Sequence, residues 1–226
     1  MPDNTFLPFS ARGLATLVAG FAALVVAAAL LSPALHGALD SVPVRAADLA
    51  AWNRARALAT PALLVAAGVS NALHGTIGIL CLTAAAAWLW RRQGRHDAWV
   101  RLLMAVPAGM LLNLLVKLIV ARDRPSWAVV DLPSSASFPS GHVAEATVFY
   151  GALAIETARR ESRRLLQGLA VAAATGLVAF VAFSRIVVGV HFLSDCLGAL
   201  AEAGLWLVLC FQGPPLLRAA APGTAP

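Results

Sequence analysis

Charged residues are scarce in this chain of 226 residues: 12% are Asp, Glu, Lys or Arg, and 60% are hydrophobic. A soluble helical protein of this size needs many polar outer faces, and the sequence does not supply them. Apolar stretches of nearly the length that crosses a bilayer recur along the chain instead. The composition therefore predicts an integral membrane protein and excludes a soluble helical core.

Cysteine and lysine are rare too. The three cysteines, Cys81, Cys196 and Cys210, lie in apolar segments without the spacing of metal ligands, so we expect buried free thiols, no disulfide framework and no metal or other cofactor. Lys117 is the one lysine among 17 basic residues, a bias that suggests a GC-rich bacterial genome. The net charge of +6 is spread over short clusters and forms no continuous basic stripe, so we expect no nucleic-acid partner.

The apolar stretches predict an all-α protein, a single domain over residues 1–226 built as a bundle of six transmembrane helices. We place the spans near 13–32, 71–90, 98–120, 142–158, 165–183 and 190–211. The first stretch could be a cleaved signal peptide, but its apolar run is longer than usual for one, so we expect a retained helix. The tail, 212–226, is rich in Gly and Pro and is expected to be flexible.

The longest connection between predicted spans is 33–70. Leu49, Trp52 and Ala55 fall on one side of a helix there, which suits a helix lying in the membrane interface. An ordinary loop explains the segment equally well.

Short arginine clusters set the expected topology. RRQGR at 91–95 and RRESRR at 159–164 fall on the same side as both termini. Because cytoplasmic loops carry an excess of Arg and Lys, both termini should be cytoplasmic, in a protein of the bacterial cytoplasmic membrane.

Polar residues that a membrane span should avoid gather at the opposite ends of the spans, the face toward the periplasm or exterior. Ionisable groups at such positions are functional candidates. Three are cations: Lys117, Arg124 and Arg185. Ser140 and the backbone N–H groups of Gly141 and His142 stand at a predicted helix N-terminus, which favours anions. Together these groups describe a site for phosphate.

His191 and Asp195 are four residues apart and share one helical face. A carboxylate in that position accepts the Nδ1 proton and leaves Nε2 free as a nucleophile. His142, from another segment, can protonate the leaving alcohol. No metal is needed in this scheme.

These residues fall into three motifs. Lys117, Arg124 and Pro125 match K-x₆-R-P, Pro139–His142 match P-S-G-H, and Ser184, Arg185, His191 and Asp195 match S-R-x₅-H-x₃-D. The chain thus resembles the type 2 phosphatidic acid phosphatase (PAP2) superfamily, with its signature over 117–195. The resemblance implies His191 as nucleophile, Asp195 as its partner and His142 as acid. It also implies a set of phosphate ligands: Lys117, Arg124, Ser140, Gly141 and Arg185.

Several polar residues stay open at this point. Arg122 is expected to be a solvated loop charge, although it could touch a head group. Asn113, one turn before Lys117, could hold the lysine or bond across helices. Glu145 and Glu202 lie inside spans and could serve the site or make structural bonds.

The expected function is a lipid phosphate or diphosphate phosphatase that forms a phosphohistidine and meets its substrate in the bilayer. Phosphatidic acid, phosphatidylglycerophosphate, undecaprenyl diphosphate and lipid A phosphate are all compatible, and the oligomeric state is open. A vanadate-dependent haloperoxidase and a transporter are the alternatives. The gathering of ionisable groups at one membrane face disfavours the transporter.

Overall fold

The computed structural model describes residues 10–212, and every regular element in that part of the chain is an α-helix. The helices are α1 (Ala11–Leu39), α2 (Val42–Ala57), α3 (Pro61–His74), α4 (Thr76–Arg92), α5 (His96–Val120), α6 (Gly141–Arg160), α7 (Arg164–Val187) and α8 (Leu193–Gln212). The all-α prediction is confirmed. Apart from Gln212, the tail predicted to be flexible lies outside the described residues.

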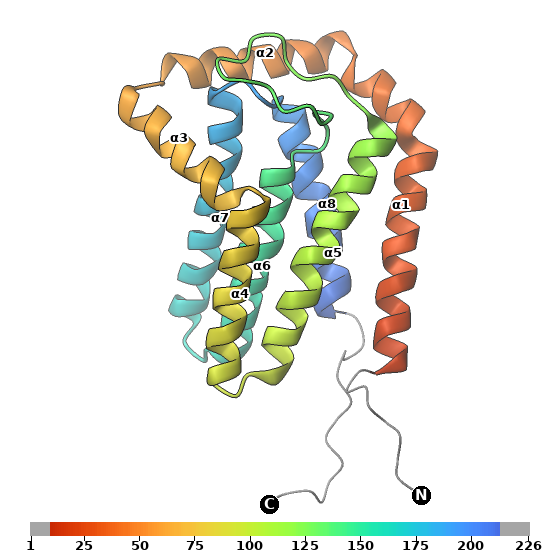
Figure 1. Ribbon diagram of the computed structural model, residues 1–226, viewed down its shortest axis with the longest axis vertical. Helices are drawn as coiled ribbons and strands as arrows, with labels where there is room; N and C mark the ends of the chain where they lie inside the picture. Colours follow the sequence, from red (N-terminus) through yellow and green to blue (C-terminus); the bar gives the residue numbers. More distant parts are fainter. Residues whose placement is uncertain (1–9, 213–226) are drawn as a thin grey trace, which may run out of the picture.

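The long helices α1, α4, α5, α6, α7 and α8 run side by side, as Figure 1 shows. Helix α2 lies across one end of this bundle, and α3 slopes from α2 back to α4. The irregular connection between α5 and α6, residues 121–140, covers the same end. The ends of α5, α6, α7 and α8 that lead to the three motifs therefore lie beneath α2 and this connection, which itself carries Arg124 and Ser140.

Four helices within 10–212 are long and apolar enough to cross a membrane: α1, α5, α7 and α8, with 29, 25, 24 and 20 residues. The count rises to five if α2 and α3, bent by 119° at their junction, form one broken span. Helix α4 has only 17 residues, and α6 carries Glu145, Glu156 and two arginines at its end. The membrane character is confirmed, and the count of six remains a prediction.

The segment before α4 differs from the expected layout. The predicted span 71–90 crosses a break at Gly75, where α3 ends and α4 begins. The connection 33–70 does contain a helix, α2, which lies across the end of the bundle. Of the three residues expected on one side of it, Ala55 is buried and Trp52 packs against the core, whereas Leu49 is 43% exposed. Asp48, next to Leu49, is buried, so a carboxylate points into the protein.

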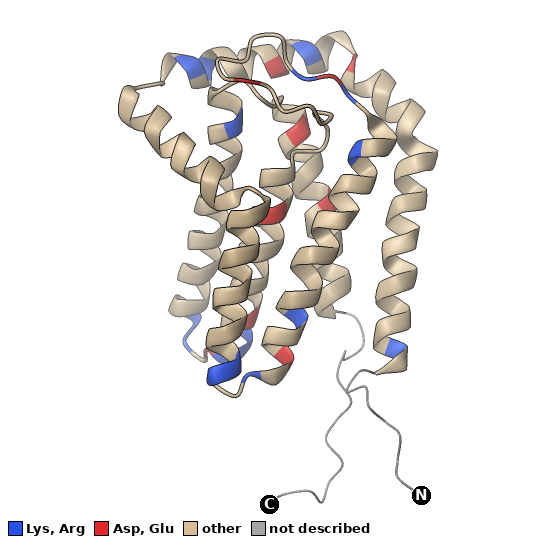
Figure 2. Cartoon of the chain, viewed as in Figure 1, with Lys and Arg blue, Asp and Glu red and all other residues tan. Residues whose placement is uncertain are grey.

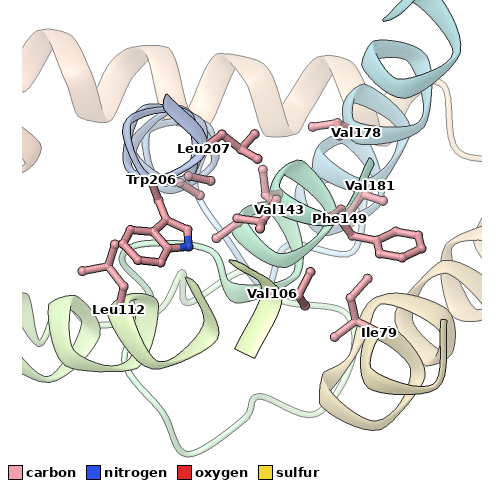
Figure 3. Packing of buried hydrophobic residues seen from close by; sticks show 14 of the residues in the cluster. Ile79, Val106, Leu112, Val143, Phe149, Val178, Val181, Trp206 and Leu207 are labelled. Atoms are coloured by element: carbon pink, nitrogen blue, oxygen red, sulfur yellow. The ribbon is translucent and has the colours of Figure 1, made fainter. Parts of the chain in front are cut away.

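Helix α6 lies at the centre of the bundle. Its buried Val143 and Phe149 contact side chains of the surrounding helices in one continuous core, which Figure 3 shows from close by. Trp206 on α8 packs into this core and donates a hydrogen bond from Nε1 to the Ala105 carbonyl oxygen on α5, at 2.8 Å. Burial on all sides explains how α6 can carry acidic residues within the bundle.

The outer surface of the bundle is apolar. Ile77, Leu30 and Leu165 are 80%, 75% and 73% exposed, a surface that a lipid environment covers. Cys196 and Cys210 are buried free thiols as expected, but Cys81 on α4 is exposed, so the prediction was wrong there. An apolar segment of a membrane protein need not face the protein interior.

Charged residues concentrate at the two ends of the bundle, as Figure 2 shows. The arginine-bearing connections between α4 and α5 and between α6 and α7 lie at one end, together with the start of α1 and the end of α8. Arg101 and Glu156 form an ion pair of 3.1 Å near that end. The candidate site is at the opposite end.

Two glycines allow the backbone to approach closely around the site. A Cβ on Gly198 of α8 would overlap the Phe138 ring, so its absence lets the residues before Ser140 pack against α8. Gly189, in the turn before His191, has φ of 75°, and a Cβ there would lie 3.0 Å from the Ala128 Cα atom. Glycine is favoured in that left-handed conformation.

Candidate active site

One cavity brings the three motifs together. Its volume is about 940 Å³, and the sequence-predicted residues in its wall come from five parts of the fold. They are Lys117 from α5, Arg124 from the following connection, Gly141 and His142 from α6, Arg185 from α7, and His191 from the turn after α7. Ser140 and Asp195 are fully buried and lie behind this wall. All eight predicted site residues are thus brought to one end of the bundle.

His191 is placed by the five-residue turn, 188–192, between α7 and α8. Its Nδ1 lies 3.3 Å from Oδ2 of Asp195, which stands in the first turn of α8. On the other side of the ring, Nε2 lies 3.4 Å from Nη1 of Arg124. These contacts assign the proton to Nδ1 and leave the lone pair of Nε2 directed into the cavity.

The electrostatic surroundings keep the His191 ring neutral. Burial lowers the pKa of His191 to about 4, although the hydrogen bond to Asp195 raises it. Because that pKa lies well below the usual value, the imidazole is uncharged near neutral pH and can act as a nucleophile at Nε2.

Arg124 is fixed by oxygens of the chain on either side of it. Nε donates to the Ser135 carbonyl oxygen at 2.8 Å, and Nη1 donates to the Val190 carbonyl oxygen at 2.8 Å. Burial lowers the pKa of Arg124 and the Asp195 carboxylate raises it. Arginine stays charged in proteins, so the guanidinium places a fixed positive charge beside Nε2 of His191.

Lys117 reaches from α5 toward the connection that leads into α6. Its Nζ donates to the carbonyl oxygens of Ala136 at 2.9 Å and Pro139 at 2.7 Å. Lys117 is 8% exposed and lines the cavity. Lys117 therefore both charges the cavity and holds the segment that precedes Ser140.

Arg185 is oriented by α3 and by its own neighbour. The guanidinium donates to Oδ1 of Asn71, to the Ala67 carbonyl oxygen at 3.1 Å and to Oγ of Ser184 at 3.1 Å. Asn71 also lines the cavity. The role of α3 in orienting this cation had no counterpart in the sequence motifs, which contain no residue before Lys117.

The N-terminus of α6 opens toward the same cavity. Ser140 is its N-cap residue, and Gly141 and His142 begin the helix. Within the described chain, Oγ of Ser140 and Nε2 of His142 are buried without a hydrogen-bond partner. Buried polar atoms are normally paired, so these two, with the free backbone donors of a helix start, suit an anionic ligand.

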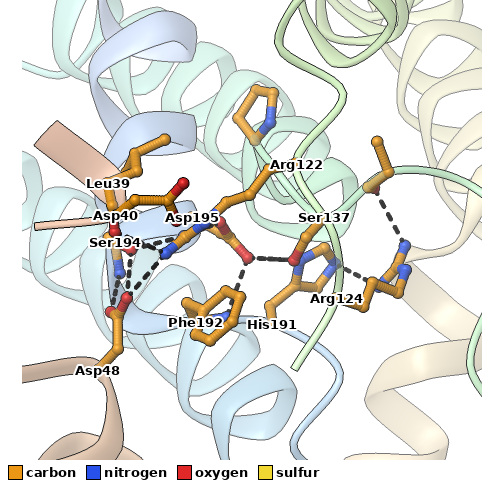
Figure 4. Close-up of polar contacts among 12 residues, drawn as sticks. Leu39, Asp40, Asp48, Arg122, Arg124, Ser137, His191, Phe192, Ser194 and Asp195 are labelled. Atoms are coloured by element: carbon orange, nitrogen blue, oxygen red, sulfur yellow. Dashed lines mark hydrogen bonds and ion pairs between the residues drawn. The ribbon is translucent and has the colours of Figure 1, made fainter. Parts of the chain in front are cut away.

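Arg122 contradicts its expected role as a solvated loop charge. It is 7% exposed and forms ion pairs with two buried carboxylates, Asp195 at 2.6 Å and Asp48 at 3.1 Å. Figure 4 shows this cluster beside His191. This pairing was hard to predict, because Arg122 stands two residues from Arg124 and no local pattern links it to a helix near the start of the chain.

The open residues inside the helices are also placed. Asn113 Nδ2 donates to Oε2 of Glu202 at 3.0 Å, a bond between α5 and α8, so Asn113 bonds across helices. Asn113 and Glu145 both line the cavity, whereas Glu202 does not. Among residues 10–212, no group of three His, Cys, Asp or Glu side chains is arranged to hold a metal ion.

The cavity has an apolar side as well as a charged one. Leu64 and Gly68 of α3 and Met110, Leu111 and Leu114 of α5 belong to its wall. Leu111 and Leu114 are each 49% exposed on the outer surface of the bundle. The charged groups are therefore continuous with an apolar flank between α3 and α5.

Comparisons with known proteins agree with this architecture. The family model of the PAP2 superfamily matches residues 98–218. Phosphatidylglycerophosphatase B of Bacillus subtilis (strain 168) is 30% identical over 185 residues, which is 79% of this chain and 88% of the relative.

Two solved structures are similar in fold. The crystal structure of the first transmembrane PAP2 type phosphatidylglycerolphosphate phosphatase from Bacillus subtilis matches with a TM-score of 0.66 and 26% identity, covering 82% of this chain and 93% of that chain. Aquifex aeolicus LpxE matches with a TM-score of 0.57 and 18% identity, over 73% of this chain and 94% of that chain, a likeness of fold alone.

The family match includes all three motifs, and the similarity to the Bacillus phosphatase covers most of both chains. The helical bundle brings those motifs to a single cavity. The resemblance noted in the sequence is confirmed: the chain belongs to the PAP2 superfamily, in its branch of membrane-bound lipid phosphatases.

Proposed function

We propose that this protein is a lipid phosphate phosphatase that works without a metal ion, through a phosphohistidine formed on His191. One observation carries the proposal. The free Nε2 of a neutral, carboxylate-held histidine faces a cavity that also receives three cations: Lys117, Arg124 and Arg185. A neutral nucleophile surrounded by fixed positive charge is suited to attack an anionic phosphate ester.

In the first step, Nε2 of His191 attacks phosphorus, and the bond from phosphorus to the lipid oxygen breaks. His142 gives its proton to the leaving alcohol. In the second step, a water molecule gives a proton to His142 as its oxygen attacks phosphorus. The N–P bond then breaks and inorganic phosphate leaves. The three cations stabilise the negative charge on the pentacoordinate phosphorus in both steps.

Phosphate ligation at the start of α6 completes the arrangement. Ser140 Oγ and the backbone N–H groups of Gly141 and His142 would donate to phosphoryl oxygens. Asp195 would stabilise the positive charge that develops on the His191 ring during attack.

The substrate would enter from the side. A lipid phosphate can place its head group among the cations while its chains lie along the apolar flank made by Leu111 and Leu114. We infer that α4 and α6 complete six spans with α1, α5, α7 and α8. The arginine-rich connections would then face the cytoplasm, and the site would face the periplasmic or outer side of a bacterial cytoplasmic membrane.

Phosphatidylglycerophosphate is the first substrate to test, because the relative of 30% identity is a phosphatidylglycerophosphatase. Purified protein in detergent should release phosphate from this lipid, measured against phosphatidic acid, undecaprenyl diphosphate and lipid A phosphate at equal concentration. Turnover should persist in EDTA. Absence of phosphate release from all four lipids would refute the function. Loss of turnover in EDTA that Mg²⁺ restores would refute the mechanism alone.

A further inference from the structure

Arg122 fills the space between two carboxylates. Nη1 donates to Oδ1 of Asp195 at 2.6 Å, and Nη2 donates to Oδ2 of Asp48 at 3.1 Å. Nη2 also lies 3.3 Å from the Leu39 carbonyl oxygen, and the guanidinium carbon is 3.9 Å from the centre of the Phe192 ring. The two acids are 2% and 0% exposed. The guanidinium therefore has one place and one orientation.

Asp48 extends this cluster to α2. Its carboxylate accepts hydrogen bonds from the backbone N–H of Ser194 at 2.8 Å and from the Ser194 hydroxyl at 2.7 Å. Ser194 is in the first turn of α8 and directly precedes Asp195. Asp48 of α2 thus caps the N-terminus of α8, the helix that carries Asp195.

Asp195 itself is held by four donors. Oδ1 accepts from Arg122, while Oδ2 accepts from the Ser137 hydroxyl, the Phe192 backbone N–H and Nδ1 of His191. Because Arg122 occupies Oδ1, the carboxylate cannot rotate away from His191 without breaking an ion pair. Figure 4 shows Asp195 between Arg122 on one side and Ser137 and His191 on the other.

We propose that Arg122 and Asp48 are positioning residues for phosphate transfer: Arg122 aims the Asp195 carboxylate at His191, and Asp48 balances the Arg122 charge so that Asp195 keeps its attraction for the imidazole. This inference rests on the proposed role of His191 as nucleophile. With all three groups in place, their net charge is one negative charge. Without Asp48, the guanidinium would offset the charge of Asp195.

Other charged or titratable groups share the cavity with His191. They are Lys117 from α5, Arg124 and Asp131 from the connection after it, His142 and Glu145 from α6, Arg185 from α7 and Arg56 from α2. None of them changes in the variants proposed below. A shift in the titration of His191 in those variants therefore reports the charges of Asp48 and Arg122.

Three variants test the charge balance. Asp48→Asn keeps an oxygen that can accept a hydrogen bond from Ser194 but removes a negative charge. The pKa of His191 should fall, so the acid limb of the pH profile of kcat/KM should move to lower pH. Arg122→Gln removes a positive charge, so the limb should move to higher pH. The double variant Asp48→Asn/Arg122→Gln has the wild-type net charge, and its limb should return toward the wild-type position.

The value of kcat should depend on how the Asp195 carboxylate is oriented, and not on the net charge of Asp48, Arg122 and Asp195. We expect kcat to fall about tenfold or more in each single variant and to stay low in the double variant, with KM little changed, as is typical of groups that orient a catalytic side chain. If Arg122→Gln does not fold, Arg122→Lys keeps the charge but cannot bridge two carboxylates. It should lower kcat and leave the acid limb in place.

Glu156→Gln is the matched control, since Glu156 is a 2% exposed acid paired with Arg101 at the far end of the bundle. It should change neither kcat nor the pH profile. The proposal is wrong if Asp48→Asn behaves as Glu156→Gln does, or if both single variants move the limb in the same direction.

Nitrogen NMR of the His191 ring measures the same titration without turnover. It should show the opposite shifts in the two single variants even if no lipid is hydrolysed. If the wild-type enzyme released phosphate from none of the lipids, that result would count against the proposed function. Failure of the positioning proposal and failure of the proposed function are therefore distinguishable.

Discussion

At the scale of the residue, the roles proposed for the two site histidines rest on what surrounds them. The His191 ring is held at Nδ1 by Asp195, while Nε2 lies 3.4 Å from Nη1 of Arg124 and stays open to the cavity. Nε2 of His142 is buried and has no hydrogen-bond partner among the described residues. A held ring suits a nucleophile that must keep one orientation, and an unpaired nitrogen suits a group that exchanges protons.

We expect His191→Ala to abolish phosphate release and to leave the helical bundle folded, because the side chain contributes little to the core. His142→Ala should lower turnover by about 10²–10⁴-fold, most strongly for poor leaving groups, as loss of a general acid does. Phosphate release and acid-quenched labelling of the protein with radioactive phosphate check both. More than a few per cent of activity in His191→Ala would show that another residue is the nucleophile.

Lys117 permits a chemical test, because it is the one lysine in the chain. An amine reagent should inactivate the enzyme, and vanadate, which resembles the transition state, should protect Lys117 from modification. Lys117→Arg should lower turnover roughly 10²–10³-fold, since a guanidinium replaces neither the compact charge nor its bonds to the Ala136 and Pro139 carbonyls. If Lys117→Arg kept nearly full turnover, and vanadate did not protect Lys117 of the wild-type protein, the lysine would have a structural role only.

At the scale of the element, the two ends of the bundle differ in what their connections carry. Ser134, in the connection that covers the site, is exposed, as is Gln93 in the arginine-rich connection at the other end. With Cys81 replaced by serine, Ser134→Cys should react with an impermeant thiol reagent from outside intact cells, and Gln93→Cys should react only after lysis. If only Gln93→Cys were labelled in intact cells, the topology would be the reverse of the one proposed, and the site would meet lipids of the cytoplasmic side.

The sequence predicts those parts of the site in which chemistry and helix geometry coincide. The ends of successive spans alternate between two faces, so the convergence of the motifs could be foreseen. His191 and Asp195 do meet as their spacing suggested, but not on one helical face, because His191 lies in the turn before α8 and only Asp195 is on the helix. The roles of Asp48 and Arg122 could not be foreseen, because their pairing joins segments 74 residues apart. Asp48 on α2 shows the same limit: apolar periodicity does not predict a buried carboxylate whose partners come from other elements.

At the scale of the whole molecule, the cavity joins a charged end to an apolar flank on α5. Leu114→Trp should narrow this flank and lower turnover of long-chain lipid phosphates several-fold, while hydrolysis of a short, water-soluble phosphate ester remains unchanged. Leu118→Trp is the matched control, since Leu118 is 67% exposed on the same helix and does not line the cavity. Equal effects on long and short substrates would argue against entry along α5.

The turn that carries His191 has a consequence for how chain length can vary in this protein. Val188–Phe192 joins α7 to α8 directly, with Arg185 before it and Asp195 after it, so an inserted residue would move His191 out of line with both. The connection 121–140 is longer, and residues 131–135 within it are exposed. A glycine inserted after Val188 should abolish activity, whereas two glycines inserted after Leu132 should leave at least half of it, measured as phosphate release by protein of equal helical content. Natural insertions and deletions should accordingly be found in the connection 121–140 and be absent from the turn 188–192. The spacing between the first and second motifs should therefore vary among related chains, whereas the spacing within the third motif should stay constant.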